Sequence, residues 1–377
     1  MSIKISHHFD AGSIEIVNAS HVENIELNLR NDSHAEIKQW FYFRLQGARD
    51  QEATIRILNA SEATYADAWN GYRAVASYDR ENWFRVETEF DGKVMTIRHT
   101  PDTDSVYYAY FEPYSWERHL SLLASVEQSE LVRIEDLGST VDGRDLNLVI
   151  VGNPSAKKKI WIIARQHPGE TMAQWMVEGT LNALLDPSNP IATSILQDAV
   201  VYLVPNMNPD GSVRGNLRTN AAGANLNREW LNPSPDTCPE VYYVKKKIEE
   251  IGCDLFLDVH GDEILPYVFV AGSEMLDGFS EKQIQEQNAF VESFCAASPD
   301  FQTKFGYEAS KYNEDMLKLA SKYIGHHYKC VSLTLELPFK DNANLPDPEV
   351  GWDGQRSMKL GEAILQPILF SIRHHRA

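Results

Sequence analysis

The chain has 377 residues, of which 43% are apolar and 24% are charged, and this is the composition of an ordinary globular protein. The length is sufficient for two domains, or for one large catalytic domain with an appendage. The formal net charge of -19 opposes binding to nucleic acid or to an anionic membrane surface, so we expect neither as a partner. The oligomeric state stays open at this point.

The N-terminus and the spacing of the cysteines bear on the cellular compartment of the protein. The first 20 residues contain no long apolar run of the kind found in secretory signals, and no segment resembles a membrane-spanning helix. The cysteines are far apart and form no Cys-x-x-Cys pair. We therefore expect a cytoplasmic protein with reduced, mostly buried thiols at Cys238, Cys253, Cys295 and Cys330.

The first 110 residues show the period-two alternation of β-strands, interrupted by Asn-Asp, Asp-Gly and Pro-Asp turn signals. This pattern predicts an antiparallel β-sandwich domain over residues 1–113. Its strands are expected at residues 13–17, 25–29, 39–45, 53–58, 83–89, 94–99 and 106–111. Aromatic residues here can line a ligand groove, although packing is the more common use; they include Trp40, Trp69, Tyr72, Tyr78 and Trp83.

After Pro113 the pattern changes, because Ser115 opens a segment with apolar residues at helical spacing. Buried-type strands then alternate with helices, which predicts an α/β domain with a mixed, largely buried sheet over residues 114–377. The strands are expected at 146–151, 159–164, 199–204, 255–259 and 331–337. The helices are expected at 171–185, 240–251, 283–297, 313–323 and 354–373.

Polar residues follow two of these strands in a way that suits a metal ion. His167 and Glu170 lie three residues apart on a tight turn after the strand at 159–164, so an imidazole and a carboxylate can converge on one cation. His260 follows the strand at 255–259 and can supply a third ligand, which gives a His, His, Glu set with one position left for water. Each piece alone is weak, because a helix start and a structural histidine give the same patterns.

Glu336 lies in the apolar strand at 331–337, where a carboxylate is costly unless it is paired, protonated or near a metal. Beside a metal it is suited to act as general base, taking a proton from the attacking water. The alternative is an ion pair with a buried Arg or Lys.

Residues 205–230 contain turn formers, amides and arginines without an apolar period, which indicates an ordered functional loop. Positive groups in such a loop can polarise a substrate carbonyl or hold a substrate carboxylate in a bidentate grip. Arg218 and the pair Asn227 and Arg228 can fill these roles, and ordinary surface ion pairs are the alternative.

Taken together, these motifs resemble the M14 family of zinc carboxypeptidases, and in particular its cytosolic carboxypeptidase branch with bacterial members. The matching segments are His167-Pro-Gly-Glu170, Asn208-Pro-Asp-Gly211, Gly215-Asn-Leu-Arg218, Asn225-Leu-Asn-Arg-Glu-Trp230, His260 after a strand, and Thr334-Leu-Glu-Leu-Pro-Phe339. The branch also carries an N-terminal β-sandwich. The segments Trp69-Asn-Gly-Tyr72, Ser77–Trp83 and Tyr108–Ser115 are similar to that domain.

The resemblance implies one Zn²⁺ bound by His167, Glu170 and His260, with Glu336 as general base. It implies that Arg218 stabilises the oxyanion, and that Asn227 and Arg228 hold the terminal carboxylate of a peptide or protein tail. Two alternatives are an N-acyl amino acid amidohydrolase of related fold and a catalytically inactive protein that binds peptide tails.

One residue departs from the family pattern, and the position of a second family residue stays open. Many members carry an acidic residue where this chain has Asn225, and an amide can accept the same hydrogen bond from a zinc histidine without adding charge. The family also has a mobile tyrosine near the substrate, for which Tyr307, Tyr312 and Tyr323 are all candidates.

Relatives in this branch remove acidic residues from protein tails, which implies a similar preference here. A pocket for an acidic side chain needs a positive group, and Lys304, Lys311, Lys318 or Lys322 can supply it. Lysines spaced along a helix are equally typical of a solvated face.

Overall fold

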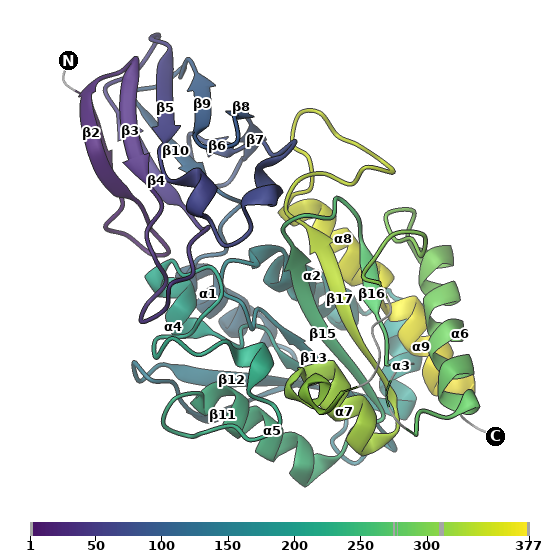
Figure 1. Ribbon diagram of the computed structural model, residues 1–377. Helices are drawn as coiled ribbons and strands as arrows, with labels where there is room; N and C mark the ends of the chain where they lie inside the picture. The colour runs from purple at the N-terminus through teal and green to yellow at the C-terminus, as the bar shows by residue number, and fades with distance from the viewer. Residues whose placement is uncertain (1–2, 274–275, 277, 309–312, 375–377) are drawn as a thin grey trace.

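Two five-stranded sheets form the N-terminal part of the molecule in the computed structural model, which describes residues 3–273, 276, 278–308 and 313–374 (Figure 1). One sheet has the order β1-β4-β10-β6-β7: Lys4–Ser6, Tyr42–Gln46, Ser105–Ala109, Val75–Ser77 and Phe84–Arg85. The other has the order β2-β3-β5-β9-β8: Glu15–His21, Asn24–Asn28, Ala53–Ile57, Met95–His99 and Glu87–Phe90.

This arrangement confirms the predicted sandwich, with differences in detail. The pairs are antiparallel except β3 and β5, which run parallel. The predicted strand at 83–89 is divided into β7 and β8, and the short strands β1 and β6 were not predicted. Packing is the use of most of the aromatic residues, since Trp40, Trp69, Tyr72 and Trp83 are buried in the core.

The second part of the molecule is built on a mixed sheet, as predicted, and this sheet has seven strands in the order β11-β12-β14-β13-β15-β17-β16. The four central strands β14, β13, β15 and β17 are parallel, so their carboxyl ends meet at one edge. The strands are Val132–Ser139 (β11), Asp145–Val151 (β12), Lys158–Ala164 (β13), Ala199–Val204 (β14), Leu255–Asp262 (β15), Phe269–Ala271 (β16) and Val331–Pro338 (β17).

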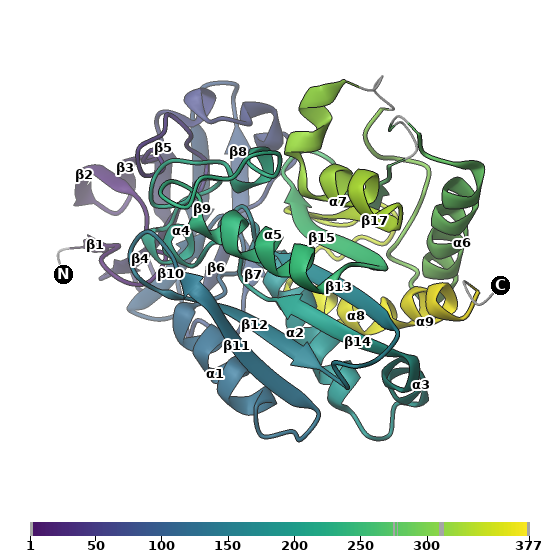
Figure 2. The same ribbon diagram turned by 90° about the horizontal axis from the view of Figure 1, so that it is seen from below.

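Helices cover both faces of this sheet, which explains why central strands such as β14 and β15 are buried along their whole length (Figure 2). Alternate residues of β13 face opposite layers: Ile160 and Ile162 join the core beneath α2, whereas Trp161 and Ile163 join the core beneath α5 and α7. The helices are Trp116–Val126 (α1), Thr171–Leu185 (α2), Pro190–Asp198 (α3), Pro209–Arg214 (α4), Pro239–Ile251 (α5), Glu281–Ala297 (α6), Ala320–Tyr328 (α7), Gly354–Ala363 (α8) and Leu365–His374 (α9).

Several predicted bounds were wrong for identifiable reasons. Within the predicted helix at 313–323, the 3-10 turn η4 (Glu314–Lys318) is separated from α7 by the extended residue Leu319. The predicted helix at 354–373 is divided into α8 and α9, where Pro367 has no N–H to continue the helical hydrogen bonds. The predicted loop at 205–230 contains α4 and the 3-10 turn η3 (Leu226–Arg228). Strands β11 and β16 and helix α3 were not predicted.

The two parts of the molecule share one continuous hydrophobic core. Tyr110, just after β10, stacks on Phe339, just after β17 of the mixed sheet, with ring centroids 4.6 Å apart. We keep the predicted domain boundary at residues 113 and 114 as a proposal, and it lies between β10 and α1. All four cysteines are free. Among the described helices, none has the length and apolar character needed to cross a membrane.

Candidate active site

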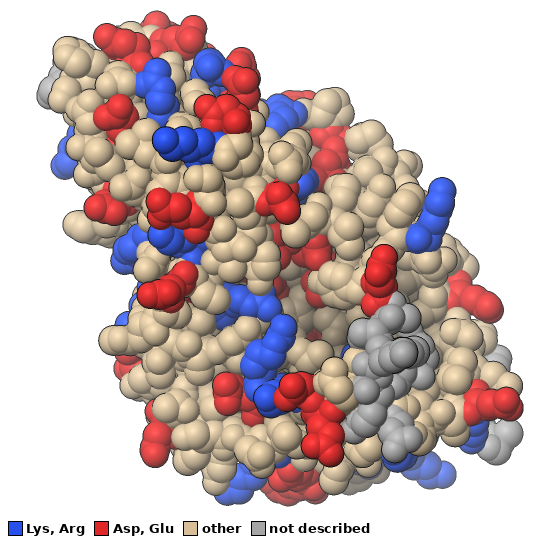
Figure 3. All heavy atoms as spheres, in the orientation of Figure 1, with Lys and Arg blue, Asp and Glu red and all other residues tan. Residues whose placement is uncertain are grey.

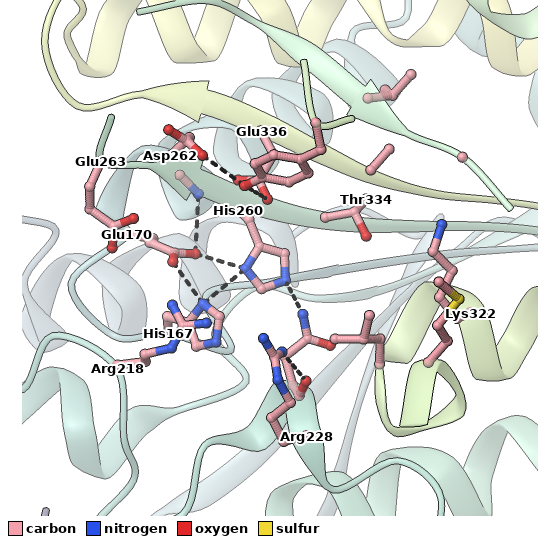
Figure 4. A pocket seen from close by; sticks show the side chains of 18 of the residues that line it. His167, Glu170, Arg218, Arg228, His260, Asp262, Glu263, Lys322, Thr334 and Glu336 are labelled. Atoms are coloured by element: carbon pink, nitrogen blue, oxygen red, sulfur yellow. Dashed lines mark hydrogen bonds and ion pairs between the residues drawn. The ribbon is translucent and has the colours of Figure 1, made fainter. Parts of the chain in front are cut away.

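The polar residues singled out in the sequence converge at the carboxyl edge of the central strands (Figure 4). His167 and Glu170 lie on the turn between β13 and α2, and His260 is near the end of the neighbouring strand β15. Glu336 in β17 is the register partner of His260, so the two side chains emerge side by side. The parallel order of these strands therefore brings together residues that are far apart in the sequence.

Two imidazoles and one carboxylate meet at a buried point. The distance between Nδ1 of His167 and Oε1 of Glu170 is 2.7 Å, and Nδ1 of His260 lies 2.8 Å from Oε2 of the same carboxylate. The two Nδ1 atoms are 3.1 Å apart. All three residues are at most 3% exposed, and together they form a group with the ligand geometry of a metal site.

The hydrogen bonds that the two imidazoles make away from Glu170 indicate which ring nitrogens face Glu170 as acceptors. Nε2 of His167 donates to Oδ1 of Asn225 at 3.0 Å, and Nε2 of His260 donates to the carboxylate of Asp258 at 2.9 Å. With their protons on Nε2, both rings direct the lone pairs of Nδ1 at the Glu170 carboxylate. Three acceptors that converge in this way are satisfied by a cation, so the donor set suits zinc.

Burial and charged neighbours shift the pKa values of all three residues in this cluster. Burial lowers the pKa of His260, but the Asp258 and Glu170 carboxylates outweigh it and hold that pKa well above its usual value. Burial also lowers the pKa of His167, to about 4, and nearby Arg218 adds to the effect. The pKa of Glu170 is held below its ordinary range, because the two imidazoles outweigh burial.

Arg165 holds the turn that carries His167 and Glu170 in shape. Its backbone has a positive φ of 61°, which is uncommon for a residue with a side chain. The buried guanidinium donates to the carbonyl of Pro168 at 2.9 Å and to the side chain of Gln174 at 2.7 Å. These bonds span the turn, so they compensate for the unfavourable backbone conformation.

Asp258 is a site residue that the sequence analysis missed. It is fully buried in β15, two residues before His260, and it accepts a hydrogen bond from Gln166 at 2.8 Å as well as from His260. A carboxylate within the apolar run 255–259, on the same face as the histidine two residues later, was the available signal.

Glu336 is buried beside the metal cluster, and its partner is a tyrosine. The Tyr307 hydroxyl lies 3.0 Å from Oε1 of Glu336 and 2.7 Å from the carboxylate of Asp262. Burial raises the pKa of Glu336 to about 8; His260 opposes this shift, whereas Glu170 and Asp262 add to it. A carboxylate with this affinity for a proton is suited to general base catalysis near neutral pH.

The basic residues line the opposite side of a cavity of about 650 Å³ (Figure 4). Figure 3 shows this hollow near the centre of one face, with Lys and Arg side chains along one wall and Asp and Glu side chains nearby. Arg218, Asn227 and Arg228 all line it. The Arg228 guanidinium donates to the carbonyl of Asn227 at 2.7 Å, and Oδ1 of Asn227 accepts from the backbone of Ala320 at 2.9 Å.

The structure also distinguishes the candidate tyrosines and lysines. Tyr307 reaches the cavity, whereas the Tyr323 hydroxyl lies 3.5 Å from Glu249 of α5, and Tyr312 lies outside the described residues. Lys322 lines the cavity, and Lys318 forms an ion pair with Asp315 at 2.7 Å. Lys304 lies over the Phe305 ring, and Lys311 is outside the described residues.

Two family models match this chain, one after the other. Residues 5–111 match the cytosolic carboxypeptidase N-terminal domain, and residues 119–349 match the zinc carboxypeptidase model of family M14. The chain belongs to the M14 zinc carboxypeptidase family. This membership agrees with the His, Glu, His cluster and with the preceding β-sandwich.

Solved bacterial carboxypeptidases have the same fold over nearly the whole chain. A metallo-carboxypeptidase from Burkholderia cenocepacia is 56% identical, with a TM-score of 0.98, and the match covers 99% of this chain and 100% of that one. A metallo-carboxypeptidase from Pseudomonas aeruginosa, solved in complex with (2-guanidinoethylmercapto)succinic acid, is 42% identical, with a TM-score of 0.96 and coverage of 99% and 100%.

Curated relatives extend to mammals. Cytosolic carboxypeptidase 6 of Mus musculus is 28% identical over 367 residues, which covers 88% of this chain and 66% of the mouse protein. An uncharacterized protein of Zymomonas mobilis is 41% identical over 365 residues, covering 97% and 95%. This M14 protein is thus a metallocarboxypeptidase. The comparisons favour neither of the two alternatives, an amidohydrolase or an inactive binding protein.

Proposed function

We propose that this metallocarboxypeptidase uses zinc, bound by His167, Glu170 and His260, to hydrolyse the C-terminal peptide bond of peptides or protein tails. The observation that carries the proposal is the convergence of both Nδ1 atoms on the Glu170 carboxylate, beside the buried Glu336. A zinc ion held by this donor set supplies Lewis-acid chemistry, which polarises the scissile carbonyl and makes water a better nucleophile at neutral pH.

The protein's own residues divide the remaining work. Glu336 takes the proton from the attacking water and then delivers it to the leaving nitrogen, which is consistent with its raised pKa. Arg218, across the cavity from Glu336, donates to the carbonyl oxygen as negative charge develops there (Figure 4).

Asn227 and Arg228 hold the terminal carboxylate of the substrate. Both line the cavity, and the contact between Arg228 and the Asn227 carbonyl keeps their polar groups together. An arginine can bind a carboxylate through two parallel N–H bonds, which selects for a free chain end. Cleavage is therefore limited to the last peptide bond.

The test is the release of C-terminal residues from a peptide library by the purified protein, with zinc, with a chelator, and with Glu336→Gln. We expect chelator-sensitive release that Glu336→Gln lowers by about 100-fold or more, whereas zinc content is retained. The matched control is Glu249→Gln on the outer face of α5, which should release residues at the wild-type rate. Residue release by the zinc-free protein, or full activity of Glu336→Gln, would contradict the proposal.

We further propose that the pocket favours an acidic C-terminal side chain, with Lys322 as its positive group. Lys322 lines the cavity beside Thr334, on the side of His260 away from Glu263 (Figure 4). The placement of this lysine in the cavity favours a pocket that accepts a second carboxylate beside the terminal one.

Lys322→Met tests this preference directly, because methionine keeps the length of the side chain but not its charge. The ratio of kcat/KM for peptides ending in Glu and in Leu should fall by about tenfold or more, as expected for the loss of one charge-assisted bond. Lys318→Met, which removes a lysine paired with Asp315, should leave the ratio unchanged. Faster release of Leu by the wild-type protein would refute the acidic preference.

We also propose a cytoplasmic location, in line with the free thiols and with relatives named cytosolic carboxypeptidases. Fractionation of the source cells with an antibody to this chain tests it, and recovery in a secreted fraction would contradict it.

A further inference from the structure

The N-terminal domain reaches into the loop that carries Arg218. The chain between β3 and β4 descends to the region of α4 in Figure 1 and places Asp32 there. The Asp32 carboxylate accepts three backbone N–H bonds, from Leu217 at 2.7 Å, Arg218 at 2.8 Å and Thr219 at 2.9 Å. The Thr219 hydroxyl adds a fourth bond at 3.2 Å. Asp32 is only 5% exposed, so these bonds are largely shielded from water.

The same loop is held from the other side by the metal-binding turn. The N–H of Gly169 donates to the carbonyl of Leu217 at 2.8 Å. A side chain at Gly169 would lie within about 3 Å of the Leu217 backbone, so the close approach requires glycine here. The Leu217 peptide is therefore fixed between Asp32 of one domain and the His167 to Glu170 turn of the other.

A second residue of the N-terminal domain contacts the Arg218 side chain itself. The guanidinium carbon lies 5.6 Å from the centre of the Tyr65 ring, within the range of a cation–π contact. Tyr65 lines the same cavity as the metal cluster. Its backbone is fixed by the buried side chain of Gln39, which accepts from the Tyr65 N–H at 3.1 Å and donates to its carbonyl at 3.3 Å.

These contacts matter because an arginine side chain has many rotamers, and ordering it in a single one costs conformational entropy. A group that stabilises a transition state acts best when it is already in place, and misplacement by about 1 Å is costly. The carboxylate of Asp32 sets the backbone position of Arg218, and the ring of Tyr65 limits where its guanidinium can lie.

We propose that Asp32 and Tyr65 are positioning residues of the active site, through which the N-terminal domain holds Arg218 toward the substrate carbonyl. The inference rests on the proposed role of Arg218 in catalysis. It makes the N-terminal domain a necessary part of the catalytic machinery, although neither residue takes part in the chemistry.

The test is a double-mutant cycle with Tyr65→Ala and Arg218→Ala, measured as kcat and KM of the zinc-loaded full chain on a peptide substrate. We expect Tyr65→Ala to lower kcat by about tenfold with little change in KM, and Tyr65→Phe, which keeps the ring face, to restore it. In the Arg218→Ala background, Tyr65→Ala should have no further effect on kcat. A protein in which Tyr65 serves only folding would instead lose activity equally in both backgrounds.

Asp32→Asn tests the backbone anchor, and Asp10→Asn is its matched control. Asp10 also belongs to the N-terminal domain and accepts a backbone N–H across the interface, but its donor is Trp116, at 2.6 Å, and not the loop that carries Arg218. Asp32→Asn should lower kcat by about tenfold or more, whereas Asp10→Asn should change only the thermal stability. If Asp32→Asn does not fold, the double-mutant cycle with Tyr65→Ala and Arg218→Ala still tests the proposal.

The outcomes separate the two proposals. If Arg218→Ala keeps the wild-type kcat, the proposed role of Arg218 is wrong and the positioning inference fails with it. If Arg218→Ala lowers kcat but Tyr65→Ala does not, or if the two effects simply add, the positioning inference alone is overturned.

Discussion

The hydroxyl of Tyr307 lies between two carboxylates, 3.0 Å from Glu336 and 2.7 Å from Asp262. A phenol has one hydrogen, so it can donate to only one of them at a time. When it donates to Asp262, its oxygen can accept a bond from a protonated Glu336, and when it donates to Glu336 it favours the ionised form. Tyr307 is therefore placed to influence the proton affinity of the proposed general base.

Tyr307→Phe should move the acidic limb of the pH profile of kcat/KM to higher pH, by up to about one unit. The reason is that the Tyr307 hydrogen bond lowers the pKa of Glu336, opposing the burial that raises it. The measurement is kcat/KM between pH 5 and 9. Tyr323→Phe is the control, because that hydroxyl lies near Glu249. Superimposable profiles for wild type and Tyr307→Phe would show that this contact does not act on Glu336.

Asp258→Asn should weaken zinc binding by about 10- to 100-fold, because the carboxylate holds His260 by its Nε2 and adds to its basicity. Competition with a chromophoric chelator measures this affinity. Asp254→Asn, at the beginning of the same region, changes a carboxylate that contacts Lys158 and should keep wild-type affinity. Unchanged affinity in Asp258→Asn would mean that the ring of His260 is fixed by other contacts.

Asn225→Asp should act in the opposite direction and strengthen zinc binding by up to about tenfold. Asn225 accepts the Nε2–H of His167 at 3.0 Å, so an aspartate would keep this bond and add a negative charge. The same chelator competition reports the change. Weaker binding would indicate that the second bond of Asn225, from the backbone of Asn227 at 3.1 Å, needs the amide.

Glu112→Gln should make the stability of the metal-free protein less dependent on pH. Burial raises the pKa of Glu112 to about 7, and the bond from the Gly354 N–H at 2.7 Å only partly offsets it. Because the folded protein binds this proton more tightly than the unfolded chain, the associated stability is full below the ordinary carboxyl pKa of about 4.5 and is lost as pH rises through about 7. The loss is on the order of 2–3 kcal/mol.

Urea unfolding at pH 5, 6, 7 and 8 in the presence of a chelator measures this effect. Wild type should lose stability over this range, and Glu112→Gln should lose less. Glu117→Gln, at an exposed position of α1, should follow the wild-type slope. If the free energy of unfolding of Glu112→Gln and wild type fell with pH at the same slope, Glu112 would be excluded as the source of the pH dependence.

The sequence predicted the residues that now lie at the metal cluster because each one interrupts an apolar pattern. His167, Glu170, His260 and Glu336 all follow or end buried strands, and parallel strands bring such ends to one edge. This reasoning needs only the order of strands and no knowledge of distant contacts. The carboxylate of Asp258 carried a similar signal but was overlooked, since it lies inside its strand.

The residues that the N-terminal domain supplies to the site were not marked by any comparable pattern in the sequence. Asp32 and Tyr65 lie in connections between elements of the sandwich, and their contacts with Arg218 join positions more than 150 residues apart. Polar and aromatic residues are common in such loops, so nothing local marks these two. The distinction between Tyr307 and Tyr323 likewise required the fold, because both lie in one short region of the sequence.

The most direct test of the central claim compares one peptide as a free acid and as a C-terminal amide, incubated with the zinc-loaded protein and analysed by mass spectrometry. The account predicts that the free acid loses its last residue, whereas the amide, which lacks the carboxylate that Arg228 and Asn227 are proposed to hold, stays intact. Equal cleavage of both peptides, or cleavage at internal bonds, would contradict it.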